Sequence, residues 1–293
     1  MHTSMMKTFC DLVDQGSFSR AAEMNNVSQS AVSQQLARLE ALYATQLLSR
    51  SGGLIAPTEA GKALYRGARD ILERFDEMGR QVKSAALGHA GSLRVGTIYS
   101  VGLYILQPFI RKFIKAHPKI DLVVEYTDWI TITESVLRGE MDIGVVAYPE
   151  KHRSLQATFL TGEQLIVVCC PRHRLSGEIS IAPQDLDGEK MVALAPDIPT
   201  RRAIDRALQR AGVRLDIVAE FDNIDTLKRA VEVDAGLSIL PKNTVEHELA
   251  ARMLIGVPFR DQAKWIRQIS LLRRRGGPRT RAQRLFVDLL RTG

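Results

Sequence analysis

The chain has 293 residues, 45% of them hydrophobic and 25% charged, and its formal net charge at pH 7 is +7. This length exceeds one ordinary domain, and the composition is that of folded domains rather than of a disordered chain. No run approaches the roughly 18 apolar residues that a membrane span needs, and the N-terminus lacks the pattern of a secretory signal. The three cysteines show no metal-ligand spacing, and we expect a cytoplasmic protein with no membrane partner.

Positive charge is concentrated near the C-terminal end. Residues 1–60 hold four Lys or Arg and five Asp or Glu. The excess lies in residues 200–293, above all in Arg273, Arg274, Arg275, Arg279, Arg281 and Arg284. A solvated surface is the simpler interpretation of such a run, because net charge alone predicts only non-specific association. The isoelectric point is therefore no argument for DNA binding.

The segment Ser17–Glu40, SFSRAAEMNNVSQSAVSQQLARLE, has the pattern of a helix-turn-helix. Ser17 and Ser28 are suited to cap two successive helices, and Asn25-Asn26 favours a turn between them. On the second helix Val32, Leu36 and Leu39 form one apolar face. The opposite face carries amide, hydroxyl and guanidinium groups, which suit a recognition helix in the major groove: Gln29, Ser30, Ser33, Gln34 and Arg38.

Two further elements follow this segment. Residues 48–57 contain Ser51-Gly52-Gly53 between short extended runs, which predicts a hairpin wing. Thr58 then caps a predicted helix to about residue 87. Its apolar residues alternate spacings of three and four, which favours a dimerising coiled coil over packing within one chain: Leu64, Ala68, Ile71, Phe75, Met78, Val82 and Ala85.

From Ser92 onward, strand and helix patterns alternate. Strands are expected at 93–97, 122–126 and 143–147, with helices at 103–116 and 130–138 between them. This βαβ pattern predicts a largely parallel sheet, and a second such run begins near Thr161. Two crossings of the chain, near Thr161 and Lys264, would leave a cleft between two α/β lobes.

These motifs resemble those of the LysR-type transcriptional regulators over the whole chain. The most specific stretches are GSFSRAAE at 16–23, VSQSAVSQQLARLE at 27–40, LSRSGGLIAPTEAG at 48–61 and NIDTLKRAVEVDAGLSILP at 223–241. The resemblance implies a multidomain α plus α/β protein: a winged helix-turn-helix (1–57), a long linker helix for dimerisation (58–90) and a two-lobed effector domain similar to the type II periplasmic binding proteins (91–293). Lobe I would hold 91–161 and 265–293, and lobe II 162–264.

The resemblance also implies how DNA is read. Gln29, Ser33 and Gln34 are the expected base contacts, since glutamine can pair with adenine through two hydrogen bonds. Residues expected to hold phosphates, which set register but carry no sequence information, are Ser28, Arg38, Arg50 and Thr58. Ala44 stands where glycine is common in the family, and Gln34 where arginine is frequent. An inert surface position is the alternative for Gln29 or Ser33, and an ion pair is the alternative for Arg38.

A small effector is expected at the ends of the strands that face the cleft. The candidate residues in the first lobe are Thr97, Tyr99, Ser100 and Thr127. Across the cleft, Thr200 and Asn223 begin helices, whose free N–H groups favour anions. We therefore expect a small anionic or zwitterionic metabolite that shifts the population of DNA-bound arrangements. Both Thr200 and Asn223 have a simpler alternative as helix caps.

Other functions fit the sequence less well. Nucleotide-binding, zinc-protease and nucleophile-elbow motifs are absent from the sequence, and no cofactor or metal is expected. A solute-binding protein and an architectural DNA-binding protein without a metabolite sensor are the alternatives. The expected partners are double-stranded DNA with an imperfect inverted repeat, a small metabolite, further copies of the chain as a dimer or a dimer of dimers, and, as a further candidate, RNA polymerase.

Overall fold

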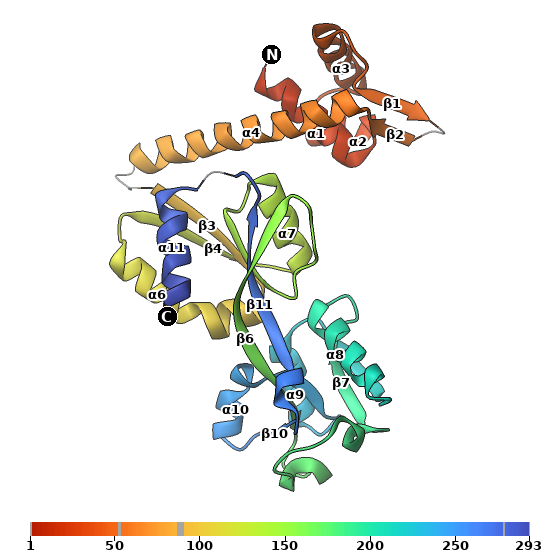
Figure 1. Ribbon diagram of the computed structural model, residues 1–293, viewed down its shortest axis with the longest axis vertical. Helices are drawn as coiled ribbons and strands as arrows, with labels where there is room; N and C mark the ends of the chain where they lie inside the picture. The colour runs from red at the N-terminus through yellow and green to blue at the C-terminus, as the bar shows by residue number, and fades with distance from the viewer. Residues whose placement is uncertain (1, 52–53, 87–90, 278, 293) are drawn as a thin grey trace. The chain divides into compact units, whose positions relative to one another are not determined.

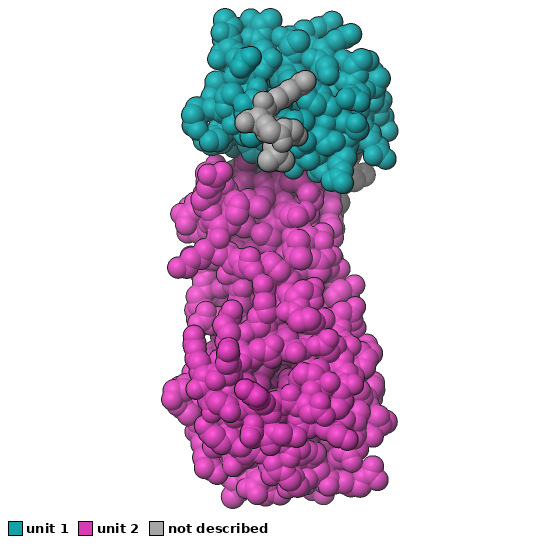
Figure 2. Space-filling view, turned by 90° about the vertical axis from the view of Figure 1, so that its right-hand side faces the viewer, with its two compact units in different colours: residues 1–88 teal, residues 89–293 magenta. Residues whose placement is uncertain are grey.

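The computed structural model describes residues 2–51, 54–86, 91–277 and 279–292. The chain divides into two compact units, residues 1–88 and residues 89–293, which are coloured teal and magenta in Figure 2. Each unit is described by itself below. Among the described residues, every helix is too short or too polar to cross a lipid bilayer.

The first unit contains the predicted helix-turn-helix, wing and long helix (Figure 1). Its elements in chain order are α1 (Thr3–Gln15), α2 (Phe18–Met24), α3 (Gln29–Tyr43), β1 (Leu48–Ser51), β2 (Leu54–Pro57) and α4 (Glu59–Ala86). Strands β1 and β2 pair antiparallel with Leu48 opposite Pro57. The apolar face of α3 lies in a core with residues of α1 and α2: Phe9, Leu12, Ala21, Ala22, Val32, Leu36 and Leu39.

The turn between α2 and α3 is fixed by polar contacts. The Asn25 side-chain amide donates to Asp11 Oδ2 at 2.8 Å and to the Ala21 carbonyl at 2.9 Å. Asn26 adopts φ +52°, in the left-handed region that asparagine tolerates better than most residues. The predicted caps are confirmed, because Ser17 accepts from the Arg20 amide and Ser28 from the Ala31 amide.

The second unit begins with a lobe built on three parallel strands. These are β3 (Gly91–Thr97), β4 (Ile120–Tyr126) and β5 (Ile143–Ala147), with β3 in the middle. Helices of this lobe are α5 (Tyr99–Val101), the π-helical turn η1 (Gly102–Leu106), α6 (Gln107–Ala116), α7 (Trp129–Arg138) and α11 (Arg281–Thr292). Phe113 of α6 and Phe286 of α11 meet edge to face in its core, at a centroid distance of 5.2 Å.

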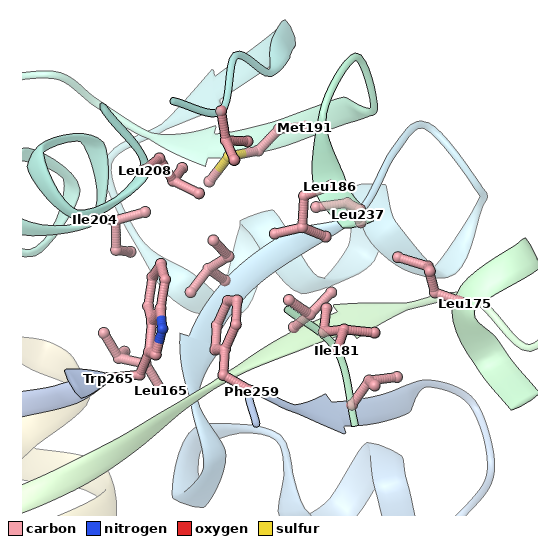
Figure 3. Close-up of a cluster of buried hydrophobic side chains, with 14 of the residues drawn as sticks. Leu165, Leu175, Ile181, Leu186, Met191, Ile204, Leu208, Leu237, Phe259 and Trp265 are labelled. Atoms are coloured by element: carbon pink, nitrogen blue, oxygen red, sulfur yellow. The ribbon is translucent and has the colours of Figure 1, made fainter. Parts of the chain in front are cut away.

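The second lobe has its own cores. Its strands are β7 (Lys190–Leu194), β8 (Asp216–Phe221), β9 (Ser238–Pro241) and β10 (Ile255–Pro258). Its helices are α8 (Pro199–Arg210), α9 (Ile224–Glu232) and α10 (Glu246–Ala250), with short 3₁₀ turns η2 (Arg174–Gly177), η3 (Pro183–Leu186), η4 (Lys242–Thr244) and η5 (Gln262–Lys264). Phe259 and Trp265 stack in one of these cores with centroids 3.7 Å apart (Figure 3).

Two long strands connect the lobes. Strand β6 (Leu155–Cys169) runs antiparallel to β11 (Ile266–Arg274), from Leu155 opposite Arg274 to Gln164 opposite Ile266. Figure 1 shows the pair passing from one lobe into the other. Beyond this pairing, β6 pairs with β9 and β10 in the second lobe.

The prediction of a largely parallel sheet is wrong in part. Parallel pairing holds for β3 with β4 and β5, and for β7 with β8. Strands β6, β9, β10 and β11 pair antiparallel. The cause is the two crossings themselves: the chain leaves the first lobe on β6 and returns on β11, so these neighbours must run in opposite directions.

The helix predicted at 103–116 starts earlier and contains a π-helical turn. The helical path begins at Tyr99 and passes through η1 before α6. Gly102 allows this turn to approach the sheet, because a Cβ there would overlap the Tyr126 ring and the Thr97 methyl group. Such turns are frequent at functional sites.

Candidate functional site

The N-terminal face of α3 presents a continuous set of exposed polar side chains. These side chains are Gln29, Ser30, Ser33, Gln34 and Arg38. On the opposite face Val32, Leu36 and Leu39 are at most 9% exposed. The helix is therefore held by its apolar side, which leaves the polar side available to a partner.

Hydrogen bonds orient the beginning of this face. Ser28 Oγ accepts from the Ala31 amide at 3.2 Å and lies 2.8 Å from Ser30 Oγ. Ser19 Oγ donates to Gln29 Oε1 at 3.4 Å, which joins α2 to the first turn of α3. The Gln29 side-chain NH₂ group then points away from this bond and can donate to an external acceptor.

The segment before β1 and the start of α4 are tied together by Thr58. Its hydroxyl donates to the Gln46 carbonyl at 2.8 Å and accepts from the Gly61 amide at 3.0 Å, which caps α4 as predicted. A phosphate contact by the same hydroxyl would require the bond to Gln46 to be exchanged. Arg50 lies on β1, but its side chain is outside the described residues.

The predicted dimer seam on α4 divides into two parts. Leu64 packs against the core of the first unit, and Ala68 is 1% exposed in a cluster with Met6 and Cys10 of α1. Four further members are large and exposed: Ile71 45%, Phe75 49%, Met78 52% and Val82 66%. The side chain of the last member, Ala85, lies outside the described residues. Two members of the stripe thus anchor α4 to its own unit, whereas four lie open.

In the first lobe, the four predicted effector residues differ in accessibility. Thr97 is fully buried, and its hydroxyl bonds the Val145 carbonyl at 3.2 Å, so it braces the strands. Tyr99 is 55% exposed and its ring lies 5.9 Å from that of Tyr126. Thr127 lies next to the cap of α7, with its hydroxyl 3.4 Å from Asp128 Oδ2.

Ser100 is held by a buried arginine from a distant strand. Arg267 Nη2 donates to Ser100 Oγ at 2.8 Å. Because arginine can only donate, the serine oxygen accepts and its own proton remains free to donate elsewhere. The Ser100 hydroxyl can therefore donate to a neighbouring acceptor while Arg267 holds its oxygen.

Arg267 forms a buried ion pair with Glu163. The two residues lie opposite each other on β11 and β6, and Arg267 Nε is 3.1 Å from Glu163 Oε2. Their side chains are only 1% and 5% exposed. Burial raises the pKa of Glu163, which the arginine opposes, and burial lowers the pKa of Arg267, which the glutamate opposes. The pair joins the crossing strands without adding net charge.

The predicted cap at Thr200 is wrong, and that at Asn223 is confirmed. Helix α8 begins at Pro199 with Ile198 as its N-cap, because proline's fixed φ and missing N–H suit the first helical position. Thr200 is 3% exposed within the first turn. Asn223 Oδ1 accepts from the Thr226 amide at 2.9 Å and thereby caps α9.

Charged side chains bridge the two lobes at two places. Arg202 of α8 pairs with Glu150 at 3.0 Å and lies over the Trp129 ring at 5.3 Å. Lys228 of α9 reaches the Tyr104 hydroxyl of η1 at 3.1 Å. Neither bridge was predicted from the sequence.

The buried positions of these charged residues follow from the alternation of side chains along a strand and from the helical period of α9. Arg267 lies two residues from Trp265 and from Ile269, and Glu163 two residues from Leu165, so both charges fall on inward-facing strand positions. Lys228 follows Ile224 by four residues on the buried face of α9. A charged residue on an apolar face needs a partner, and this rule would have identified all three.

Comparison with protein families decides the class of the chain. The model described as LysR substrate binding domain matches residues 86–293, and that of the bacterial regulatory helix-turn-helix protein, lysR family, matches residues 3–62. The chain belongs to the LysR family. It is a DNA-binding transcriptional regulator with an effector-binding domain, and it is not an enzyme. Regulators of this family bind DNA and small effectors and act as oligomers.

Curated relatives match over nearly the whole length. The uncharacterized HTH-type transcriptional regulator YbhD of Escherichia coli is 28% identical, covering 98% of this chain and 90% of that one. CysL of Bacillus subtilis is 24% identical over 100% and 97% of the two chains. The RuBisCO operon transcriptional regulator of Allochromatium vinosum is 28% identical over 98% and 96%.

Solved LysR-type regulators share the fold. A full-length OxyR variant from Pseudomonas aeruginosa superposes with a TM-score of 0.68 at 23% identity, over 100% of this chain and 95% of that one. The effector-binding domain of QuiR in complex with shikimate gives 0.63 at 22% identity, over 69% of this chain and 96% of that one. At these identities the likeness establishes the fold alone.

Proposed function

We propose that this LysR-type regulator binds an imperfect inverted repeat through paired heads and responds to a small anionic or zwitterionic metabolite in its two-lobed domain. The observation that supports the DNA-binding part of this proposal is the exposed polar face of α3 opposite its buried apolar side. Gln29, Ser33 and Gln34 would contact bases, while Ser28, Ser30, Arg38, Arg50 and Thr58 would position the head on phosphates and neighbouring groups.

Pairing of two chains would follow from the four exposed residues of the α4 stripe. Ile71, Phe75, Met78 and Val82 recur at spacings of four, three and four residues, which suits a coiled-coil partner. A dimer with two-fold symmetry reads a site with matching symmetry, hence the inverted repeat. Two such dimers would form a dimer of dimers that engages neighbouring sites, and RNA polymerase remains a candidate partner at the promoter.

The second half of the proposal rests on Ser100. Arg267 already donates to the Ser100 oxygen, so the hydroxyl proton is available to a ligand group that accepts hydrogen bonds. Tyr99 and Thr127 would line the same end of the sheet, and Thr97 would support them from behind. On the other lobe Thr200 and Asn223 lie at helix starts, where N–H groups favour negative charge. The shikimate bound by the similar QuiR domain is itself a carboxylate.

The regulator would act in the cytoplasm, where bacterial DNA lies. Ligand binding would favour one arrangement of the lobes and of the paired heads, and the coupling is expected to be about 1–3 kcal/mol, which is typical of allosteric proteins.

Mapping of DNA bound in cells, followed by footprinting of purified protein, tests the DNA half. We expect protected sites with inverted symmetry that change in length or spacing when effector is added. Protection without symmetry would contradict the dimeric mode of binding. Calorimetric titration with organic acids and amino acids tests the effector half. Binding that is weakened in Ser100→Ala is expected, while no response to any of these metabolites would contradict it.

A further inference from the structure

We propose that Tyr104, Asp225 and Lys228 form a latch between the two lobes, which the π-helical turn η1 couples to the effector site. The coupling rests on the proposed effector site, whereas the latch itself rests on contacts alone. Tyr104 belongs to the first lobe, and Asp225 and Lys228 lie on α9 of the second lobe.

The contact between the lobes is a short polar chain. The Tyr104 hydroxyl donates to Asp225 Oδ1 at 2.7 Å and accepts from Lys228 Nζ at 3.1 Å. The Tyr104 hydroxyl thus makes two hydrogen bonds to charged groups of the opposite lobe.

Contacts within the second lobe hold Lys228 in place independently of Tyr104. Its side chain is 6% exposed, and its ammonium lies 2.9 Å from Glu248, 3.0 Å from Asp225 and 3.0 Å from the Thr244 carbonyl. With Tyr104 the ammonium has four oxygen neighbours for its three N–H donors. When the tyrosine leaves, the three acceptors of the second lobe can take all three donors, so the contact can break without unfolding α9.

The position of Tyr104 ties the latch to the effector residues. Tyr99 and Ser100 on α5 continue without a break into η1, which carries Tyr104. Gly102 fits tightly against Tyr126 and Thr97 and so anchors the middle of this segment on the sheet. A ligand that draws Tyr99 and Ser100 toward itself would turn the segment about this fixed point at Gly102 and would thereby shift the Tyr104 hydroxyl.

Hydrogen–deuterium exchange on the full-length protein tests the latch without any ligand. The variant Tyr104→Phe keeps the ring and removes only the hydroxyl. We expect exchange to rise by about tenfold or more in the peptides covering both 99–106 and 224–232, because the variant loses two hydrogen bonds to charged groups. Asp225→Ala removes the acceptor of the Tyr104 hydroxyl and should raise exchange in the same peptides. The double variant should show less than the combined single effects, because both changes break one shared contact.

Tyr65→Phe is the matched control, because the Tyr65 hydroxyl donates to Asp14 at 2.6 Å within the first unit. It should leave both peptides unchanged. Unchanged exchange in Tyr104→Phe would overturn the latch, and so would a rise on one side only. A rise that equally includes the core strand 190–194 would also count against it, since this would report general loosening. None of these results depends on DNA or effector binding, so failure of the latch is distinguishable from failure of the proposed function.

Discussion

Gly61, in the first turn of α4, lies directly against the backbone carbonyl of Leu47. A Cβ at position 61 would overlap the oxygen of this carbonyl, which belongs to main chain and cannot rotate away. The same carbonyl accepts from the Thr58 amide at 3.0 Å, so the residue just before the wing and the start of the long helix meet at one point. Glycine is needed here for close approach, although it weakens a helix elsewhere.

Replacement of this glycine should destabilise the first unit. We expect Gly61→Ala to lower the free energy of unfolding by about 1–3 kcal/mol, the usual cost of overpacking. At Gly67 on the same helix, an added methyl group would meet no other atom within 4 Å, so Gly67→Ala should raise stability by about 0.5–1 kcal/mol. Denaturant titration of the two variants compares them. Equal changes in the free energy of unfolding for the two variants would contradict the close contact between Gly61 and Leu47.

Ala44 is held in a conformation that suits glycine. It ends α3 with φ +49° and ψ +37°, where a Cβ is strained. Ala44→Gly should therefore stabilise the protein by about 0.5–1 kcal/mol, despite the added freedom of the unfolded chain. Ala41→Gly, three residues earlier within the helix, should cost about 1 kcal/mol. A loss of stability in both variants, measured by thermal unfolding, would argue against the left-handed cap.

The Asp225 carboxylate should make stability depend on acid. Burial alone would raise its pKa, but hydrogen bonds from Tyr104 and Lys228 and the lysine charge prevail and lower it below the ordinary 3.8. The unfolded chain then binds the proton more readily. The stabilisation is complete well above pH 3.8 and is lost as the pH falls through the lowered pKa. Unfolding free energies between about pH 6 and pH 2 should fall less steeply in Asp225→Asn; curves parallel to wild type would contradict this account.

The four exposed residues of the α4 stripe should hold two chains together. Phe75→Glu combined with Met78→Glu introduces charge into an apolar seam, and we expect loss of at least one association step in sedimentation experiments. Asp76 is exposed on another side of α4, so Asp76→Lys should leave the oligomer intact. An unchanged sedimentation coefficient in the double variant would show that α4 is not the contact.

Local features of this chain could be predicted from sequence because they depend on near neighbours. Ser17, Ser28 and Asn223 cap helices through their own side chains, and the apolar period of α3 defines its buried face. The resemblance to LysR-type regulators supplied the order of domains. Thr200 was misplaced because Pro199 outweighs it as a helix start.

Long-range contacts could not be predicted in this way. The pairing of Glu163 with Arg267 depends on the register of two strands about a hundred residues apart, and no local pattern fixes that register. The approach of Tyr104 to Lys228 depends further on a π-helical turn, which adds a residue to the helix and changes the direction of its side chains. In both cases the sequence pattern predicts that a charged residue is buried, but it does not predict which residue pairs with it.

Binding of Gln29→Ala to a mapped operator, measured by fluorescence anisotropy beside a DNA of unrelated sequence, tests the central claim most directly. We predict a loss of about 1–3 kcal/mol on the operator, as for one bidentate base contact, and little change on unrelated DNA. Gln209→Ala, at an exposed position of α8, should behave as wild type. Unchanged operator affinity in Gln29→Ala would contradict the recognition of DNA by this face of α3.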